Sequence, residues 1–368
     1  MTKRLPARPR VVGGLPVLRR KQGELQIGLD PRHATVVGGL PDTVVAAAQR
    51  LTGHRTTTDL LDGLAPADRD GFTALLQVLF EQGFLEDAAG VPPRRPGEAC
   101  ASAVQALHTD VPPIERADLG LVVRGDGRLA VTVACLLAGA GVGWVHVSAS
   151  GSVQPEDVGT GYLPDDVGVP RRVAARRAVR RASPNVRTAP FGSAHSPDLV
   201  VLTDALVPRP EEVDMLTTAI MPHLLVRVRD TTGIVGPFVV PGLTSCLRCA
   251  DLHRCDRDEC WPQLAVQLAG QAQLTDVAGT HATAAFAVTQ ALDAAAWLRG
   301  GSQPPATCEV SIELDLRGVT VRHRGWSPHP GCGCGVASRR SGDQSHSTKV
   351  AADTAEELRQ SDRDGDAS

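Results

Sequence analysis

The sequence has almost no net charge. Its 38 Lys and Arg residues nearly balance 41 Asp and Glu residues, which leaves a formal net charge of −3. No field of one sign surrounds the whole protein, so only a local patch could recruit a nucleic acid or an anionic membrane. Lysine is also scarce, and arginine supplies nearly all of the positive charge. We interpret this scarcity as a composition bias without functional meaning.

Long hydrophobic runs are absent with one exception. Residues 129–147 contain no Asp, Glu, Lys or Arg, but three glycines in the second half predict a buried helix, a turn and a buried strand rather than a membrane span. No apolar segment follows the basic N-terminus, so we expect no secretory signal and a cytoplasmic protein. Nine cysteines in that compartment are not expected to form a disulfide framework.

The composition is that of a folded protein with more than one domain. Hydrophobic residues make up 42% of the 368 residues and charged residues 21%, which excludes a mainly disordered chain. Residues 11–88 predict a small winged-helix module, and the prolines in 89–100 predict a linker. The expected strands of the module lie at 17–20, 24–28 and 34–37, and its helices at 44–51, 58–64 and from about residue 67. In the last helix, Phe72 to Phe80 carry one apolar face.

Residues 101–335 predict an α/β domain with a mostly parallel, doubly wound sheet, because apolar strands alternate with helices. The expected strands lie at 119–123, 144–147, 186–189, 199–202 and 224–228. The expected helices lie at 129–138, 169–182 and 281–298, and a terminal hairpin pairs 308–316 with 319–323. The polar segment 336–368 predicts a disordered tail.

Two cysteine motifs give the strongest chemical signal. They comprise Cys246 with Cys249 and Cys332 with Cys334, and glycines surround the second pair. Two such turns bring four thiolates to one ion and close a tetrahedral shell, which is typical of a structural zinc site. The alternative is four ordinary buried thiols. Cys255 and Cys260 lie nearby and could substitute for a ligand or bind a second ion, and His329 is a weaker candidate ligand.

A glycine turn follows the strand expected at 119–123. Gly125 and Gly127 precede a helix, and such a turn lets a nucleotide phosphate approach backbone amides at the helix N-terminus. Asp126 and Arg128 interrupt the glycine pattern, and Ser148 stands where an acidic residue would hold a ribose. The other interpretation is that the turn only shapes the backbone and binds no nucleotide.

Together these features resemble the ThiF/MoeB superfamily, the ubiquitin-activating-type adenylyltransferases. The resemblance covers about residues 101–335. It is carried by the glycine turn, the run VGVPRRVAARRA, the strand that ends in Thr203 and Asp204, the stretch GPFVVPGLTSCLRC and the late WSPHPGCGC. It implies a Rossmann-like ThiF-type domain and a homodimer.

The resemblance also implies roles for individual residues. Gly125 and Gly127 match the first glycines of the family's ATP loop. Arg171 occupies the place of its phosphate-binding lysine, and Asp204 matches the aspartate that holds Mg²⁺. Other family positions are changed, namely Arg128, Ala130, Ser148 and Ala205. Each lost charge-assisted contact is worth about 1.5 to 3 kcal/mol, so we do not expect tight binding of ATP and Mg²⁺.

A degenerate ThiF-like domain preceded by a winged-helix module resembles the partner proteins of azole- and azoline-forming peptide biosynthesis. This implies that residues 11–88 bind the leader of a precursor peptide and that the chain presents it to a YcaO-type cyclodehydratase. We expect the leader to add as a strand at the edge formed by Glu24–Gly28. The alternative function is an adenylyltransferase that activates a carboxylate with MgATP.

Two other interpretations of the N-terminal module stay open. A DNA-reading helix should be basic, but residues 57–87 hold seven acidic residues and one basic residue, so no nucleic-acid partner is expected. The module could also merely pack on the larger domain, because fold alone does not establish a binding role. The arginine stripe Arg172, Arg176 and Arg180 indicates a solvated helix face or a contact for an acidic partner.

Overall fold

The structure is a computed structural model that describes residues 5–12, 15–31, 34–89, 116–272, 276–301 and 303–339. The chain divides into two compact units, Met1–Arg116 with Gly139–Gly141 and Ala117–Ala138 with Val142–Ser368. Each unit is described by itself. Residues 90–100 of the expected linker and 340–368 of the expected tail lie outside the described residues, so these expectations stay predictions.

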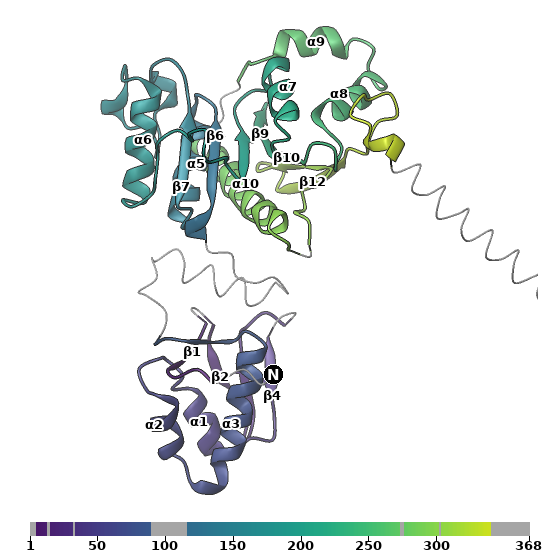
Figure 1. The fold of residues 1–368 in the computed structure, drawn as a ribbon. Coiled ribbons are helices and arrows are strands. Elements are labelled where there is room, and N and C mark those ends of the chain that lie inside the picture. The colour runs from purple at the N-terminus through teal and green to yellow at the C-terminus, as the bar shows by residue number, and fades with distance from the viewer. Residues whose placement is uncertain are drawn as a thin grey trace, which may run out of the picture. The chain divides into compact units, whose positions relative to one another are not determined.

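The described residues of the first unit form three helices and two small antiparallel sheets (Figure 1). Its strands are β1 (Pro9–Val11), β2 (Val17–Arg19), β3 (Leu25–Ile27), β4 (Thr35–Val37) and β5 (Leu85–Asp87), and its helices are α1 (Asp42–Ala48), α2 (Thr57–Asp62) and α3 (Pro66–Glu81). The helical spacing of Phe72, Leu76 and Leu79 places one apolar face of α3 in the core. There it joins Leu25 and Ile27 of β3.

The larger sheet of the first unit has the strand order β2-β3-β4. Leu25 of the central strand pairs with Arg19 of β2 on one side and with Val37 of β4 on the other. The expectation that residues 24–28 form the open edge is therefore wrong, because both sides of β3 are already paired. Among the described residues, the open edges of this sheet are β2 and β4.

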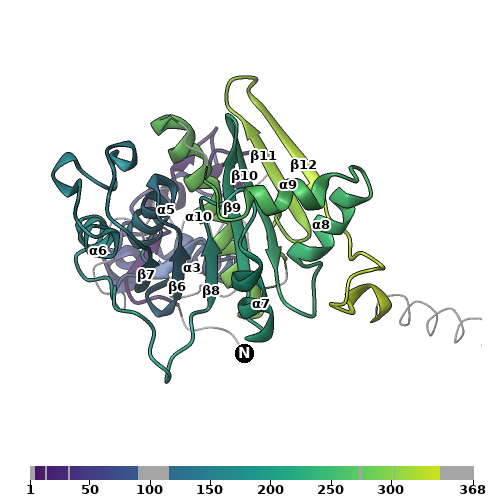
Figure 2. The same cartoon turned by 90° about the horizontal axis from the view of Figure 1, so that it is seen from above.

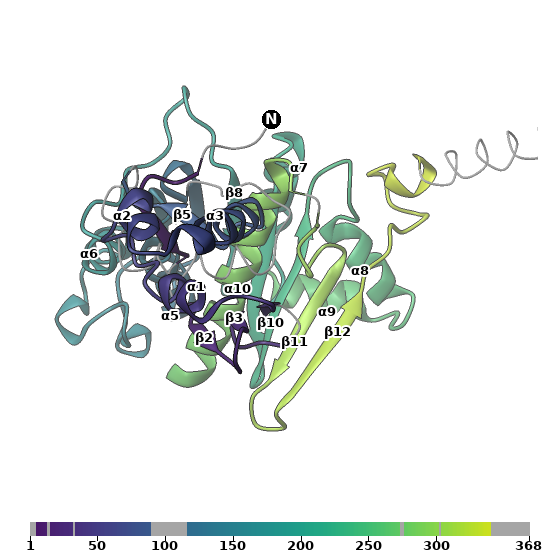
Figure 3. The ribbon, with the colours of Figure 1, turned by 90° about the horizontal axis from the view of Figure 1, so that it is seen from below.

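The second unit is built on a sheet with the order β12-β11-β10-β9-β8-β6-β7 (Figure 2). Its strands are β6 (Gly120–Arg124), β7 (Trp144–Ser148), β8 (Leu199–Leu202), β9 (His223–Arg229), β10 (Thr232–Val239), β11 (Val310–Asp315) and β12 (Thr320–Gly325). The strands β7, β6, β8 and β9 are parallel, and β10 to β12 continue the sheet in antiparallel fashion. This confirms the Rossmann-like α/β fold. The expected terminal hairpin is β11 with β12, which forms one end of the sheet (Figure 3).

Helices cover both faces of this sheet. They are α5 (Arg128–Gly139), α6 (Arg171–Ala182), α7 (Pro210–Thr218), α8 (Leu247–Cys255), α9 (Trp261–Leu268) and α10 (Val277–Leu298), and short 3₁₀ turns lie at Arg116–Asp118, Pro155–Asp157 and Pro164–Asp166. Leu225 of β9 packs in one cluster with Leu216 of α7 and Leu247 of α8. Figure 2 shows α10 on the opposite face. The glycine at Gly233 permits its close approach, because a Cβ there would overlap Thr283 of α10.

The segment 186–189 is not a strand, which corrects the sequence prediction. It runs beside β7 and makes two backbone hydrogen bonds, from Arg187 N–H to Gly143 O and from Val145 N–H to Arg187 O, both at 2.9 Å. Pro190 follows at once and has no N–H to continue a ladder. The strand β10, in contrast, was not expected from the sequence.

The charge-free stretch 129–147 forms α5, a turn and β7, as predicted. Within the described part of the chain, no helix is both long and apolar enough to cross a bilayer.

Candidate functional site

The strand order reverses between β6 and β8. From β6 the chain passes through α5 to β7 on one side, and it returns through α6 to β8 on the other side. In open α/β sheets, ligands bind at such a switch point, beyond the carboxyl ends of the strands. The residues there, Gly125–Gly127 after β6 and Thr203–Asp204 after β8, are called the β6–β8 edge below.

The structure brings Gly125, Gly127 and Asp204 together at this edge. The N–H of Gly127 donates a hydrogen bond to Asp204 Oδ2 at 2.9 Å, and the Thr203 hydroxyl donates to Arg124 O at 2.9 Å. A Cβ at Gly125 would overlap Thr203 Oγ1 and Asp204 Oδ2. Only glycine therefore fits this close approach of the two strand ends.

Three carboxylates gather around the edge. Asp126 accepts hydrogen bonds from Ser150 N–H at 2.6 Å and from Ser150 Oγ at 2.9 Å, and Asp157 is buried. The pKa of Asp204 is raised to about 6, mainly by burial and also by the charges of Asp126 and Asp157, although the hydrogen bonds from Gly127 and Thr203 oppose this increase. The edge is thus acidic, and Asp204 titrates far above an ordinary aspartate.

Arg171 is the first residue of α6, and its guanidinium is hydrogen-bonded to groups of the same chain. Two of its nitrogens, Nε and Nη2, donate to Asp157 Oδ2 at 3.0 and 2.7 Å, and Nη1 donates to Ser150 O at 3.2 Å. The cation that the resemblance assigns to a phosphate is therefore neutralised by a carboxylate of the same chain.

Tyr162 is a residue of this region that sequence reasoning missed. The side chain is fully buried, and its hydroxyl has no hydrogen-bond partner among the described residues. Burial raises the pKa of Tyr162, and the nearby charges of Asp157, Asp204 and Asp126 act in the same direction. Tyr162 is the only tyrosine of the chain, but it lies in a stretch without periodicity, so no pattern marked it.

The resemblance implies ATP and Mg²⁺ at this edge, and the residues present do not fit a phosphate chain. Phosphate sites use free backbone N–H groups at a helix N-terminus and an available cation. Here the Gly127 N–H donates to Asp204, and Arg171 is bound to Asp157. At this edge the ends of β6 and β8 are hydrogen-bonded to each other, so these donors are not free for a phosphate.

The four cysteines singled out by the sequence converge on one point. Cys246 is the N-cap of α8, Cys249 follows in its first turn, and Cys332 and Cys334 lie in the glycine-rich turn after β12. The Sγ–Sγ distances are 3.7 Å for Cys246–Cys249, 3.6 Å for Cys246–Cys332 and 3.7 Å for Cys249–Cys334. Four sulfurs about 2.3 Å from a tetrahedral ion are about 3.8 Å apart. The cluster can therefore hold a metal ion.

The surroundings of the cluster favour an anionic sulfur. A hydrogen bond from the Cys246 thiol holds the pKa of Cys249 well below its usual range, and the backbone N–H of His329 adds to this decrease although burial opposes it. The thiolate is the form of cysteine that binds metals. In the absence of an ion only Cys249 is favoured as a thiolate, because the hydrogen bond with Cys249 raises the pKa of Cys246 and burial raises the pKa of Cys332. The case for a ligand set therefore rests on the geometry of the four sulfurs.

His329 and Asp256 position the glycine-rich turn against α8. The N–H of Gly331 donates to His329 Nδ1, and the other ring nitrogen, Nε2, therefore carries the proton and donates to Asp256 Oδ2, each at 3.0 Å. Both ring nitrogens are engaged, so His329 supports the turn. Within the described chain, Cys255 and Cys260 lie outside the four-cysteine cluster.

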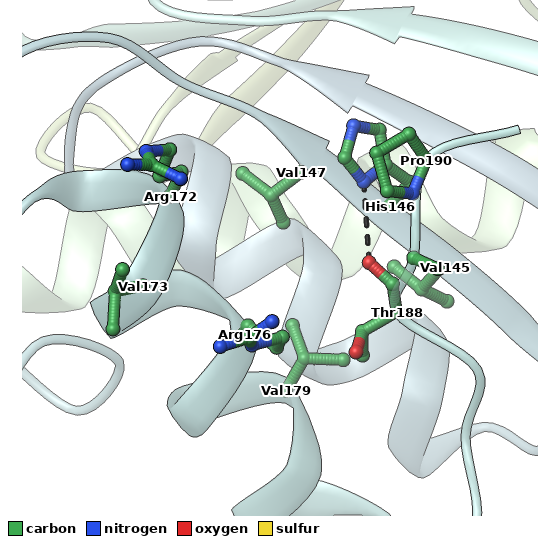
Figure 4. Close-up of a pocket in the computed structure, with 10 residues that line it drawn as sticks. Val145, His146, Val147, Arg172, Val173, Arg176, Val179, Thr188 and Pro190 are labelled. Carbon is green, nitrogen blue, oxygen red and sulfur yellow. Dashed lines mark hydrogen bonds between the residues drawn. The ribbon is translucent and has the colours of Figure 1, made fainter.

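A cavity of about 210 Å³ lies between β7 and α6. Figure 4 shows valines of both elements lining it, with Arg172 and Arg176 on the helix side and His146 hydrogen-bonded to Thr188 O at 3.2 Å. Both arginines are exposed. Two members of the arginine stripe therefore border a small apolar cavity, while their charged ends stay in solvent.

The fold occurs in solved structures, although no protein-family profile and no curated protein matches the chain by sequence. E. coli MccB solved with ATP has a TM-score of 0.63 at 14% identity, covering 89% of this chain and 99% of that one. The microcin C7 biosynthetic enzyme MccB in complex with N-formylated MccA gives the same TM-score, identity and coverage. PaaA gives a TM-score of 0.62 at 16% identity, covering 85% of this chain and 98% of that one.

At these identities the likeness shows the fold alone. The aligned share of this chain is larger than its second unit, so the likeness extends into the first unit. The comparisons therefore confirm the Rossmann-like α/β fold that the resemblance implies.

Proposed function

We propose that this protein binds a ribosomal precursor peptide and presents it to a partner cyclodehydratase, without ATP chemistry of its own. The β6–β8 edge carries the proposal. An ATP phosphate would have to displace the contacts of Gly127 and Arg171 and approach the carboxylates of Asp126, Asp157 and Asp204. Charges of like sign repel strongly where water is partly excluded, so this edge disfavours a nucleotide.

Peptide binding is supported by the fold and by the first unit. A structure with the same fold has been solved with N-formylated MccA. In the described part of the first unit, β2 and β4 are unpaired edges, and an edge strand can pair with an extended peptide. Leu18 of β2 and Val36 of β4 are exposed by 37% and 43%, and such apolar side chains can contact the anchors of a leader.

The metal that suits the four-cysteine cluster is Zn²⁺ in a structural role, because four thiolates fill its tetrahedral shell and leave no open position. Cys246, Cys249 and Cys332 pack in one buried cluster with Val122 and Leu202 of the sheet. A bound ion would fix α8 and the turn after β12 to that sheet.

Calorimetry with MgATP on the purified full chain tests the absence of ATP chemistry. We expect no binding at millimolar nucleotide and no exchange of labelled pyrophosphate into ATP when a precursor peptide is present. Exchange by the natural chain that disappears in Asp204→Ala would overturn the proposal.

An adenylyltransferase that activates a carboxylate with MgATP is the second candidate. It is favoured by the ATP complex of MccB, which has the same fold, and by Asp204, which matches the family's Mg²⁺-binding aspartate. The pyrophosphate exchange assay separates the two candidates, because only the adenylyltransferase forms an acyl-adenylate and releases pyrophosphate.

Hydrogen exchange of the full chain tests the peptide role. The probe is a synthetic leader of a precursor encoded beside a YcaO-type enzyme. We expect protection of β2 or β4 amides and no change in the central β3. Leu18→Asp and Val36→Asp are matched variants, and only the one on the occupied edge should weaken binding, by about tenfold. Protection confined to the second unit would contradict leader capture by residues 11–88.

Light scattering and co-purification of the same sample test the homodimer and the YcaO-type partner.

A further inference from the structure

A cavity of about 420 Å³ lies against the antiparallel part of the second unit's sheet. Its walls come from β9, β10, β11, β12, α8 and α9, and the side chains that matter here are Arg227, Arg254, Arg257, Arg324, Trp261 and Trp326. It is called the arginine pocket below. Sequence reasoning did not single out any of these six residues.

The arginine pocket has an excess of positive charge. Among the described residues that line it, five are arginines and two are carboxylates, Asp258 and Glu313. Glu313 is already engaged, because Arg324 Nε donates to its Oε1 at 2.9 Å and Arg229 Nη2 lies 3.7 Å from the same oxygen. Asp251, just behind the wall, accepts from Arg254 Nη1 at 2.6 Å. These carboxylates leave the charge of the pocket positive.

Arg227 is the residue that points most directly to a ligand. Only 7% of it is exposed, and its Nη1 has no hydrogen-bond partner among the described residues. Burial, together with the positive charges of Arg254 and Arg229, lowers the pKa of Arg227 to about 9. The guanidinium is still charged at neutral pH, and a buried charged donor without an acceptor is costly. An anion in the pocket would remove that cost.

Aromatic rings hold the arginines around the cavity in place. The guanidinium carbon of Arg254 lies 4.6 Å from the ring centre of Trp326 and 5.1 Å from that of Trp261. The indole N–H of Trp326 donates to Ser311 Oγ at 2.8 Å, which fixes the ring. Stacked guanidinium groups lose little freedom when they bind an oxyanion.

We propose that the arginine pocket binds the carboxylate of an acidic peptide side chain. A carboxylate matches the planar donor pattern of guanidinium groups. The cavity is larger than an inorganic anion needs, and Leu206, Ile234 and Leu268 give it apolar walls that suit the aliphatic part of a side chain. The choice of a peptide rests on the proposed function, whereas the anion site rests on the pocket alone.

Tryptophan fluorescence and calorimetry of the full chain test this inference, because two of its four tryptophans line the pocket. The probes are acetyl-Ala-Glu-Ala-amide, its Gln counterpart and inorganic phosphate, all at one ionic strength. We expect the Glu peptide to bind at least tenfold more tightly than the Gln peptide. Equal binding of the two peptides, or binding of phosphate but not of the Glu peptide, would overturn the proposal.

Arg227→Met is the decisive variant, and Arg317→Gln in the exposed turn between β11 and β12 is the matched loss of one positive charge outside the pocket. We expect at least a tenfold loss of Glu-peptide affinity in the first and no loss in the second. If Arg227→Met does not fold, Arg324→Gln on the exposed strand β12 replaces it, with an expected loss of at least threefold. A folded pocket variant that keeps full affinity would refute the inference. Leader capture is measured at β2 and β4, so the two proposals can fail separately.

Discussion

The four-cysteine cluster, which the cysteine spacing indicates, and the β6–β8 edge, where the ThiF resemblance implies a nucleotide, differ in what their side chains face. In the cluster, sulfur atoms face one another 3.6 to 3.7 Å apart, which leaves a central point that a metal ion can occupy. At the edge, donors face acceptors of the same chain. Gly127 donates to Asp204, and Arg171 to Asp157.

This difference follows from how each candidate site is distributed along the sequence. Two short turns supply the whole metal shell, and each turn carries its two ligands a few residues apart. The nucleotide site depends on residues after β6, before α6 and after β8 together. At this edge the donors Gly127 and Arg171 have acceptors within the same chain, Asp204 and Asp157, so a nucleotide would have to compete with these contacts.

The largest effect is expected from breaking the cluster. Cys246→Ser and Cys332→Ser should each lose about one equivalent of zinc and about 4 kcal/mol or more of folding stability, because structural zinc contributes directly to folding. Elemental analysis and thermal unfolding measure both quantities. Cys260→Ser, at an exposed cysteine outside the cluster, is the control and should change neither. Unchanged metal content in both cluster variants would mean that the four cysteines are ordinary buried thiols.

A smaller effect is expected from forcing the closed edge apart. Gly125→Ala adds a Cβ that overlaps Thr203 and Asp204, and such overpacking should cost about 1 to 3 kcal/mol in urea unfolding. Gly139→Ala at the end of α5 is the control, since no described atom lies within 4 Å of a Cβ there. Equal stability of the two variants would show that the edge is open, contrary to the comparison drawn above.

The smallest effect concerns the charge on Asp204. The pKa of Asp204 is raised to about 6 in the folded protein, against about 3.9 for an ordinary aspartate. At a pH between these two values, Asp204 is protonated in the folded state but has lost its proton in the unfolded state. The contribution of Asp204 to the free energy of unfolding is therefore greatest below pH 4 and decreases as the pH rises to about 6. Because two pKa units correspond to at most about 3 kcal/mol, Asp204→Asn should be more stable than the natural chain at pH 7 by up to that amount, and equal below pH 4.

Urea unfolding of both proteins between pH 4 and pH 8 measures this difference. Asp165→Asn, at an exposed position of a 3₁₀ turn, removes the same charge and serves as the control. A stability difference between Asp204→Asn and the natural chain that does not change with pH would contradict the raised pKa of Asp204.

Much of the fold could be predicted from local patterns. The helical spacing of Phe72, Leu76 and Leu79 predicted α3, and the charge-free stretch 129–147 predicted α5 and β7. The segment 186–189 misled the same reasoning, because its residues have strand propensity while Pro190 limits their pairing to two hydrogen bonds. Propensity is a property of a few residues, but strand pairing also requires a neighbour in register.

The candidate sites show the same division. The spacing of Cys246, Cys249, Cys332 and Cys334 indicated a ligand set, and the four sulfurs do meet. The sequence also named Gly125, Gly127, Arg171 and Asp204 at the edge. It did not reveal Asp157 as the partner of Arg171, because that contact depends on how the loop before α6 folds back.

The sequence by itself determined the alternation of strands and helices and the two cysteine turns, because both features depend on residues that are close along the chain. Only the tertiary structure decided that β3 is a central strand, that Gly127 donates to Asp204, and that Arg227, Arg254 and Arg324 surround one cavity. These contacts join residues tens of positions apart. Their existence depends on strand order and register, which the local spacing of apolar and polar residues does not specify.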